Sequence, residues 1–273
     1  MAKAVNKNEM SFLDHLEDLR WHIIRAFVAI GIAGVIAFMF KSFIFDVIIL
    51  GPKSADFPTY RILCNLSKLL GLDESFCFDE LPFKIQSRKV ASQFSVHLWT
   101  SVTAGFVLAF PYVIYQMWSF IAPGLYNREK KSARWFIIIS SFMFFLGVLF
   151  GYYVISPLSI RFLGTYQVSE QVFNEFDIES YIGLVRTSIL ACGVMFELPI
   201  IIYFLAKFGL VTPDFLKKNR KYAIVLILIV SAVITPPDVA SQFIVSIPVL
   251  VLYEISILIT KIIYKRELKK QKR

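Results

Sequence analysis

Several apolar runs, each long enough to cross a lipid bilayer, constrain this chain more than any other feature of its sequence. A hydrocarbon core of about 30 Å requires a helix of about 20 apolar residues. Lipid offers no hydrogen bonds to the backbone, so only helices and closed barrels can cross it. The alternating pattern of barrel strands is absent. The sequence therefore predicts an all-α polytopic membrane protein.

Six transmembrane helices are predicted, and the last two spans are expected to be short. The runs cover about residues 21–40, 94–115, 135–155, 182–206, 222–234 and 242–264. The fifth run has 13 residues, which gives a helix of about 20 Å. We expect residues 1–273 to form one integral membrane domain, with an amphipathic segment at 1–20, a long outside loop at 41–93 and a basic tail at 265–273.

Basic residues beside the ends of these runs predict the orientation. With both termini inside, the inside segments hold 20 of the 29 Lys and Arg residues. The long outside loop has seven, offset by six acids. This asymmetry is the one that the positive-inside rule describes, and it predicts an N-in/C-in topology. It also explains the net charge of +9, so no nucleic-acid partner is expected.

The sequence lacks the short motifs of enzymes and metal sites. It has three His residues and no H-E-x-x-H, G-x-S-x-G, Walker A or C-x-x-C pattern. We therefore expect neither catalysis nor a metal ion, and no cofactor.

Two features predict local packing. Gly147 and Gly151 form a G-x-x-x-G pattern, which allows two helices to approach closely. Cys64 and Cys77 both lie in the outside loop. They form a disulfide if that side is oxidising, or remain two buried thiols. Cys192 lies within a span and is expected to pack in the core.

Carboxylates at or inside the membrane are the candidate functional groups. Asp18 lies in an amphipathic helix that should start at Ser11, run along the inside surface and enter the first span. Glu129 follows a Pro-Gly break in a basic inside loop. Glu197 falls within the fourth span, where burial of a carboxylate is costly and usually marks function. Glu254 interrupts the sixth span, and the same argument from the cost of burial applies to it with less force.

Four stretches together resemble the TatC family of the twin-arginine protein translocase. They are FLDHLEDLR before the first span, YQMWSFIAPGLYNREKK between the second and third, FELP in the fourth, and TPPDVASQ between the fifth and sixth. They occur in the order and at the spacing typical of that family. The resemblance covers about residues 11–264.

The resemblance implies a function and its partners. Members of the family act as signal-peptide receptor and core of a machine that exports folded proteins across the bacterial cytoplasmic membrane, driven by the protonmotive force. The partners implied are twin-arginine signal peptides and small single-span subunits of the TatA and TatB type, in a multimeric complex surrounded by membrane lipids.

The resemblance also implies two groups of site residues. The signal-peptide group is Glu129, Asp18, Glu17, Phe120 and Pro123. The group for partner contact and transport is Glu197, Asp238, Gln242, Pro52 and Tyr152. The family usually has Glu at the position of Asp18 with an apolar residue before it. Here Glu17 precedes Asp18, so Glu17 is included as a residue that shares the role.

A proton-coupled secondary transporter of a small solute is the main alternative. It would use Glu197 and Asp238 as proton sites and would need a cavity at mid-membrane between broken helices. The sequence shows one intramembrane acid of clear weight and no convincing inverted repeat. These features favour the translocase interpretation.

Overall fold

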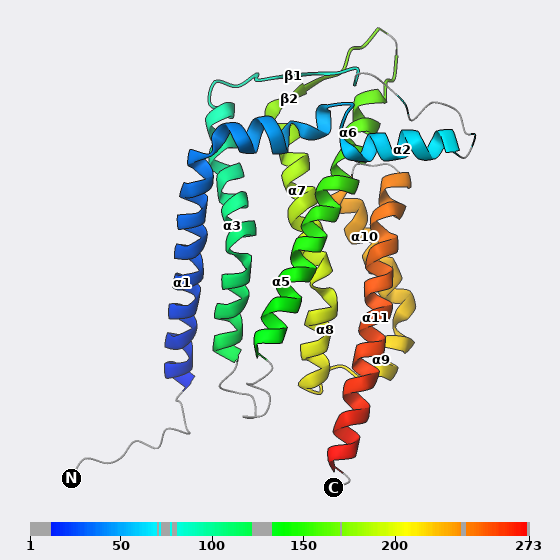
Figure 1. The fold of residues 1–273 in the computed structure, drawn as a ribbon. Coiled ribbons are helices and arrows are strands. Elements are labelled where there is room, and N and C mark those ends of the chain that lie inside the picture. The colour runs from blue at the N-terminus through cyan, green and yellow to red at the C-terminus, as the bar shows by residue number, and fades with distance from the viewer. Residues whose placement is uncertain are drawn as a thin grey trace, which may run out of the picture. The chain divides into compact units, whose positions relative to one another are not determined.

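The structure, a computed structural model, describes residues 12–69, 71, 77, 81–121, 133–169, 171–235 and 239–271. Helices dominate it, as predicted (Figure 1). In chain order the elements are α1 (Phe12–Met39), the π-helix η1 (Phe43–Ile49), the 3-10 helix η2 (Gly51–Lys53), α2 (Pro58–Leu69), β1 (Lys84–Gln86), α3 (Ser92–Ile121), α5 (Ala133–Phe150), the π-helix η5 (Gly151–Ile155), α6 (Ser156–Thr165), β2 (Glu175–Asp177), α7 (Ile178–Phe196), α8 (Leu198–Lys207), α9 (Pro213–Lys218), α10 (Arg220–Ile234) and α11 (Val239–Gln271).

Five helical segments are long and apolar enough to cross a membrane: Leu16–Met39, Ser92–Ile121, Trp135–Thr165, Ile178–Lys207 and Gln242–Lys265. They match the first four predicted spans and the sixth. The third runs on through η5 into α6, beyond its predicted end. These segments confirm a multi-pass membrane protein.

The lengths of the last two helices differ from each other. The fifth predicted span corresponds to α10, whose 15 residues give about 22 Å, well short of the hydrocarbon core. The prediction that the last span is also short is wrong, because the apolar segment of α11, Gln242–Lys265, has 24 residues, which is enough to cross the hydrocarbon core. The whole helix has 33 residues. Its basic end continues the helix, since Lys, Arg, Glu and Gln are strong helix formers.

The predicted helix along the inside surface is also absent from the described residues. α1 is one uninterrupted helix of 28 residues, so Asp18 and the first span share a single axis. No Gly or Pro occurs between Phe12 and Ile30 to break it.

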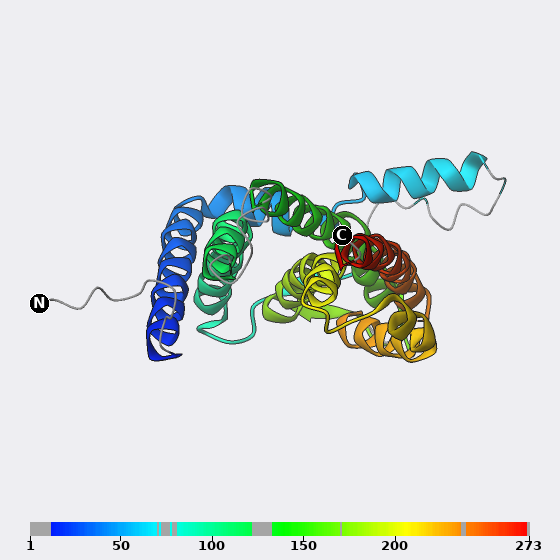
Figure 2. The same ribbon diagram turned by 90° about the horizontal axis from the view of Figure 1, so that it is seen from below.

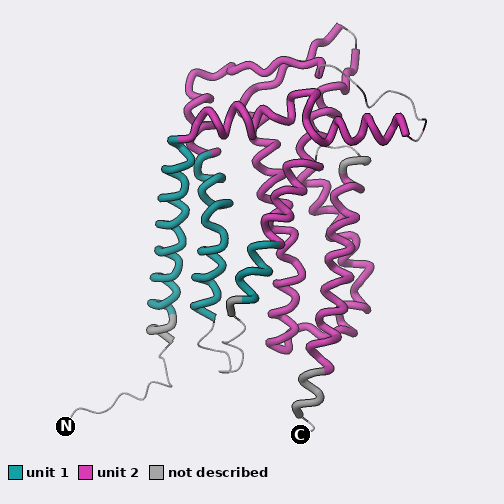
Figure 3. Tube along the Cα trace, in the orientation of Figure 1, with its two compact units in different colours: residues 1–39, 101–142 teal, residues 40–100, 143–273 magenta. Residues whose placement is uncertain are grey.

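The chain divides into two compact units (Figure 3). Unit 1 comprises residues 1–39 and 101–142, and within it α1 and α3 run side by side (Figures 1 and 2). Their backbones nearly touch, because a Cβ placed on Gly105 would lie 2.5 Å from the backbone nitrogen of Gly34. Only glycine permits this approach.

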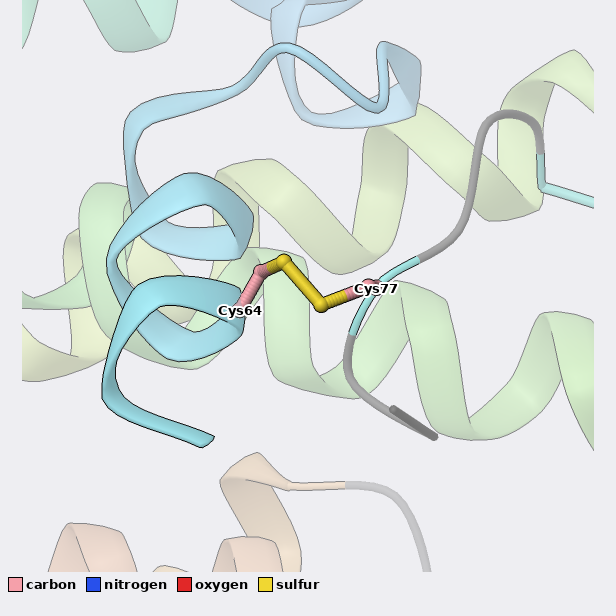
Figure 4. Close-up of a disulfide and its surroundings, with 2 residues drawn as sticks. All are labelled: Cys64 and Cys77. Atoms are coloured by element: carbon pink, nitrogen blue, oxygen red, sulfur yellow. A yellow bond between two sulfur atoms is a disulfide. The ribbon is translucent and has the colours of Figure 1, made fainter. Parts of the chain in front are cut away.

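Unit 2 comprises residues 40–100 and 143–273. Its core joins α8, α9, α10 and α11 through the buried side chains of Ile202, Leu216, Ile227, Val249, Tyr253 and Ile257. β1 and β2 form a two-stranded parallel sheet in which Lys84 pairs with Glu175 and Gln86 with Asp177. A disulfide joins Cys64 of α2 to Cys77, which confirms one of the two predicted alternatives (Figure 4). Cys192 is a buried free thiol.

The G-x-x-x-G pattern is a packing surface, as predicted. A Cβ on Gly147 would lie 2.4 Å from the carbonyl oxygen of Cys192, and one on Gly151 would lie 2.5 Å from that of Ser188. Both contacts join the α5–η5 helix to α7. Real Cβ atoms do not come this close to backbone, so any larger side chain must separate the two helices.

We predict that Gly147→Ala lowers the free energy of unfolding by about 1–3 kcal/mol through overpacking against α7. Gly183→Ala is the matched control, because a Cβ there meets nothing within 4 Å, and it should be neutral or stabilising by up to about 1 kcal/mol. The unfolding midpoints of both variants in detergent measure the difference. Equal midpoints would show that α5 and α7 are not in close contact.

Candidate functional site

The N-terminal end of α1 presents two open carboxylates. Glu17 and Asp18 are both exposed, in the second turn of the helix. Among the residues that the structure describes, no cation forms an ion pair with either carboxylate. Both groups can therefore accept hydrogen bonds from a ligand.

His22 joins this part of α1 to the end of α3. Its Nδ1 lies 2.6 Å from Oε1 of Gln116, so the ring donates a hydrogen bond to a buried amide. Its ring also meets Phe120 edge-to-face, with 6.3 Å between centroids. Phe120 is the penultimate residue of α3. The structure thus brings two of the predicted signal-peptide segments together within unit 1.

The next residues along the chain bear the rest of that group. Pro123 and Glu129 lie outside the described residues, in the segment 122–132 between α3 and α5. Trp118 near the end of α3 packs on Phe136 near the start of α5, with 4.8 Å between ring centroids. This contact holds the two helix ends that flank the segment.

Glu197 occupies the break between α7 and α8. Pro199 has no N–H and cannot donate the helical bond that would continue α7, so the helix ends and restarts there. The Glu197 backbone N–H donates to the Val194 carbonyl at 3.1 Å. The residue is 7% exposed, as predicted for an acid within a span. The helix break could not be read from the charge pattern, but Pro199 indicates it.

Two polar contacts fix the pairing of α10 with α11. The Gln242 amide donates to the Leu228 carbonyl at 3.1 Å. At the N-terminal end of α10, Arg220 donates to Glu254 at 2.7 Å, and both side chains are about half exposed. Asp238, predicted to act with Gln242, lies outside the described residues. The Arg220–Glu254 ion pair was not predicted, because 33 intervening residues separate its members.

Three tyrosine hydroxyls, one of them from Tyr152, bond to backbone carbonyls of the segment 48–52, which contains Pro52. Tyr152 donates to the Ile48 carbonyl at 2.9 Å, and Tyr181 to that of Ile49 at 3.2 Å. The Tyr60 hydroxyl lies 3.0 Å from the Pro52 carbonyl and 2.8 Å from that of Pro157. Burial raises the pKa of Tyr60 well above its ordinary value, so its hydroxyl stays a donor. These bonds brace the segment 48–52 against the helices. No sequence motif indicated Tyr60 or Tyr181, because their partners lie far away along the chain.

Within the described residues, no group of three His, Cys, Asp or Glu side chains could hold a metal ion.

Comparison with known proteins identifies the family. The sequence model described as Sec-independent protein translocase protein (TatC) matches residues 14–248. The chain belongs to the TatC family. A Sec-independent protein translocase protein TatC from Blattabacterium sp. subsp. Periplaneta americana is 42% identical over 96% of this chain and 98% of its own length. The one from Desulforapulum autotrophicum is 35% identical over 94% of this chain and 86% of its own.

A solved structure supports the same assignment. The crystal structure of a twin arginine translocase receptor, TatC, superposes on this chain with a TM-score of 0.70 and 31% identity, covering 92% of this chain and 99% of that one. The fold of this TatC-family chain is therefore shared with that receptor. The roles predicted for individual residues stay predictions.

We predict that Tyr152→Phe lowers the free energy of unfolding by about 0.5–1.5 kcal/mol, since it removes one hydrogen bond. Amide hydrogen exchange across residues 48–52 should rise in parallel. Tyr153→Phe is the matched control. The ring of Tyr153 stacks on Phe57 and no described bond uses its hydroxyl, so it should change stability by less than about 0.5 kcal/mol. Equal exchange in both variants would contradict a bracing role for Tyr152.

Proposed function

We propose that this chain is the signal-peptide receptor and core subunit of a twin-arginine translocase that exports folded proteins across the bacterial cytoplasmic membrane, driven by the protonmotive force. Family membership supports the proposal. The observation that carries it is the contact of His22 with Gln116 and Phe120, because it joins the α1 carboxylates to the helix that leads to Glu129.

The chemistry of the ligand fits these carboxylates. Two consecutive guanidiniums need acceptors that they can engage with two parallel hydrogen bonds each. Glu17, Asp18 and Glu129 would supply those acceptors beside the apolar start of a span, where such pairs are stronger than in water. Phe120 and Pro123 would shape the segment that presents Glu129. Selection of Arg over Lys would follow from the planar fork of the guanidinium.

A second group of residues would serve partner subunits and transport. Glu197 would meet a polar residue of a single-span subunit of the TatA or TatB type, because a buried acid at a helix break can bond to a neighbouring helix. Asp238 and Gln242 would act at the outer turn between α10 and α11. Pro52 and Tyr152 would keep the segment 48–52, which lies outside in the proposed topology, in the conformation that a multimeric complex requires.

The proposed topology has six spans with both termini in the cytoplasm. α10 counts as the fifth span although it is about 22 Å long. A span this short must thin the bilayer locally or lie behind neighbouring helices. We propose that this thinning, at α10 alone, lowers the barrier for cargo beside the receptor.

Replacement of the docking carboxylate provides the main test. In cells whose only copy carries Glu129→Gln, export of a folded reporter behind a twin-arginine signal should fall by about tenfold or more, and crosslinking to the signal peptide should fall with it. Loss of a charge-assisted bond costs about 1.5–3 kcal/mol, and 1.4 kcal/mol is tenfold in affinity. Asp18→Asn should have a smaller effect if Glu17 shares the role.

Asp214→Asn is the control, since Asp214 is an exposed carboxylate on the same proposed side of the membrane. It should leave export and crosslinking unchanged. If Glu129→Gln accumulates normally and both readouts survive, the docking site lies elsewhere. If deletion of the whole gene leaves export intact, the proposed function itself is wrong and solute transport is the function to test.

The partner site has a separate test. Glu197→Gln should reduce co-purification of a single-span partner subunit at least severalfold, while crosslinking to the signal peptide persists. Glu254→Gln is the comparison, because it removes an acid that already pairs with Arg220, and it should leave the partner bound. Full retention of the partner by Glu197→Gln would contradict the assignment.

A further inference from the structure

A groove of about 420 Å³ runs along α1 and α3 within unit 1. Trp21, Arg25 and Tyr112 line it together with the apolar side chains of Ile24, Val28 and Ile32. None of these residues belongs to the groups assigned above to signal peptides or partner subunits. The lining is apolar except for one cation and two aromatic residues with polar tips.

The contacts between α1 and α3 show in which order the residues that line the groove follow one another along the helix axes. His22 lies level with Gln116, and Gly34 lies level with Gly105. The two helices are therefore antiparallel, and Tyr112 falls near the level of Arg25. Trp21, Arg25 and Tyr112 form one end of the groove. Val28 and Ile32 form the other, which lies deeper in the span.

Arg25 is an exposed cation close to one edge of the first predicted span. It lies four residues after Trp21, where the first predicted span begins, and so about 6 Å along the helix axis from that edge of the span. A charged group at such depth is costly unless it reaches the interface or pairs. Among the described residues, no carboxylate forms an ion pair with Arg25. Asp18 is two turns away along α1.

We propose that this groove binds one anionic phospholipid from the leaflet at the inner end of α1. The Arg25 guanidinium would hold the phosphate with two parallel hydrogen bonds. The Trp21 N–H and the Tyr112 hydroxyl would lie at the level of the headgroup, where these residues are favoured. One acyl chain would lie on Ile24, Val28 and Ile32, which extend over about 12 Å of helix. This inference rests on α1 crossing the membrane and does not depend on the export function.

Native mass spectrometry of the full chain tests the proposal. The wild type in neutral detergent should bind one phosphatidylglycerol at least about tenfold more tightly than phosphatidylcholine, which lacks net charge. Arg25→Gln should abolish that preference. Arg20→Gln removes the same charge from an exposed position of α1 that does not line the groove, and it should keep the preference.

A second measurement locates the lipid. In vesicles of phosphatidylcholine, brominated phosphatidylglycerol should quench the fluorescence of Trp21 more than brominated phosphatidylcholine does, in a variant with Trp99, Trp118 and Trp135 changed to Phe. If this variant fails to fold, the difference in quenching between wild type and Trp21→Phe gives the same information. Equal quenching by the two lipids would overturn the proposal.

Three other results would also overturn it. Equal loss of preference in Arg25→Gln and Arg20→Gln would indicate diffuse attraction to the basic helix. No loss in Arg25→Gln would place the lipid elsewhere. A signal peptide that occupies the groove, with no preference for phosphatidylglycerol in its absence, would identify the groove as part of the peptide site.

Discussion

Backbone hydrogen bonding in lipid is the constraint on which the rest of this structure depends. No water is present there to replace a lost backbone hydrogen bond. The chain therefore crosses the membrane as helices, and a helix can break only where another group bonds to the free backbone N–H and C=O groups. Glu197 lies at one such place, where Pro199 ends the α7 ladder and the Glu197 N–H turns to Val194. The costliest polar side chain of the span therefore stands where the helix is already broken.

The same constraint explains how the helices pack. Lipid tails are as apolar as leucine, so helices gain little by burying apolar side chains against each other. Close contact must then come from small residues, and Gly105 and Gly147 provide it within their respective units. Polar contacts then determine which helices pair. The hydrogen bond of Gln242 to Leu228 and the ion pair of Arg220 with Glu254 join α10 to α11.

Features that depend on the local pattern of the sequence were predicted well. The long apolar runs, the short α10 and the close packing at Gly147 and Gly151 follow from local pattern. Contacts between distant residues did not follow from it. The bonds from Tyr60 and Tyr181 to the segment 48–52 depend on tertiary folding, and so does the contact of His22 with Phe120. The length of α11 was misjudged because a basic tail was taken for the end of a helix.

The pairing of α10 with α11 has a consequence for the membrane around them. Glu254 lies midway along the apolar segment Gln242–Lys265, and Arg220 at the start of α10 is bonded to it. The Tyr253 hydroxyl donates to the Leu216 carbonyl in α9, so the basic residues of α9 and early α10 sit near the same level. A flat hydrocarbon core of about 30 Å that covered the apolar segment Gln242–Lys265 would also enclose the Arg220–Glu254 ion pair. The Arg220–Glu254 ion pair at this level of α11 is therefore the structural feature that supports the proposed thinning of the bilayer beside α10.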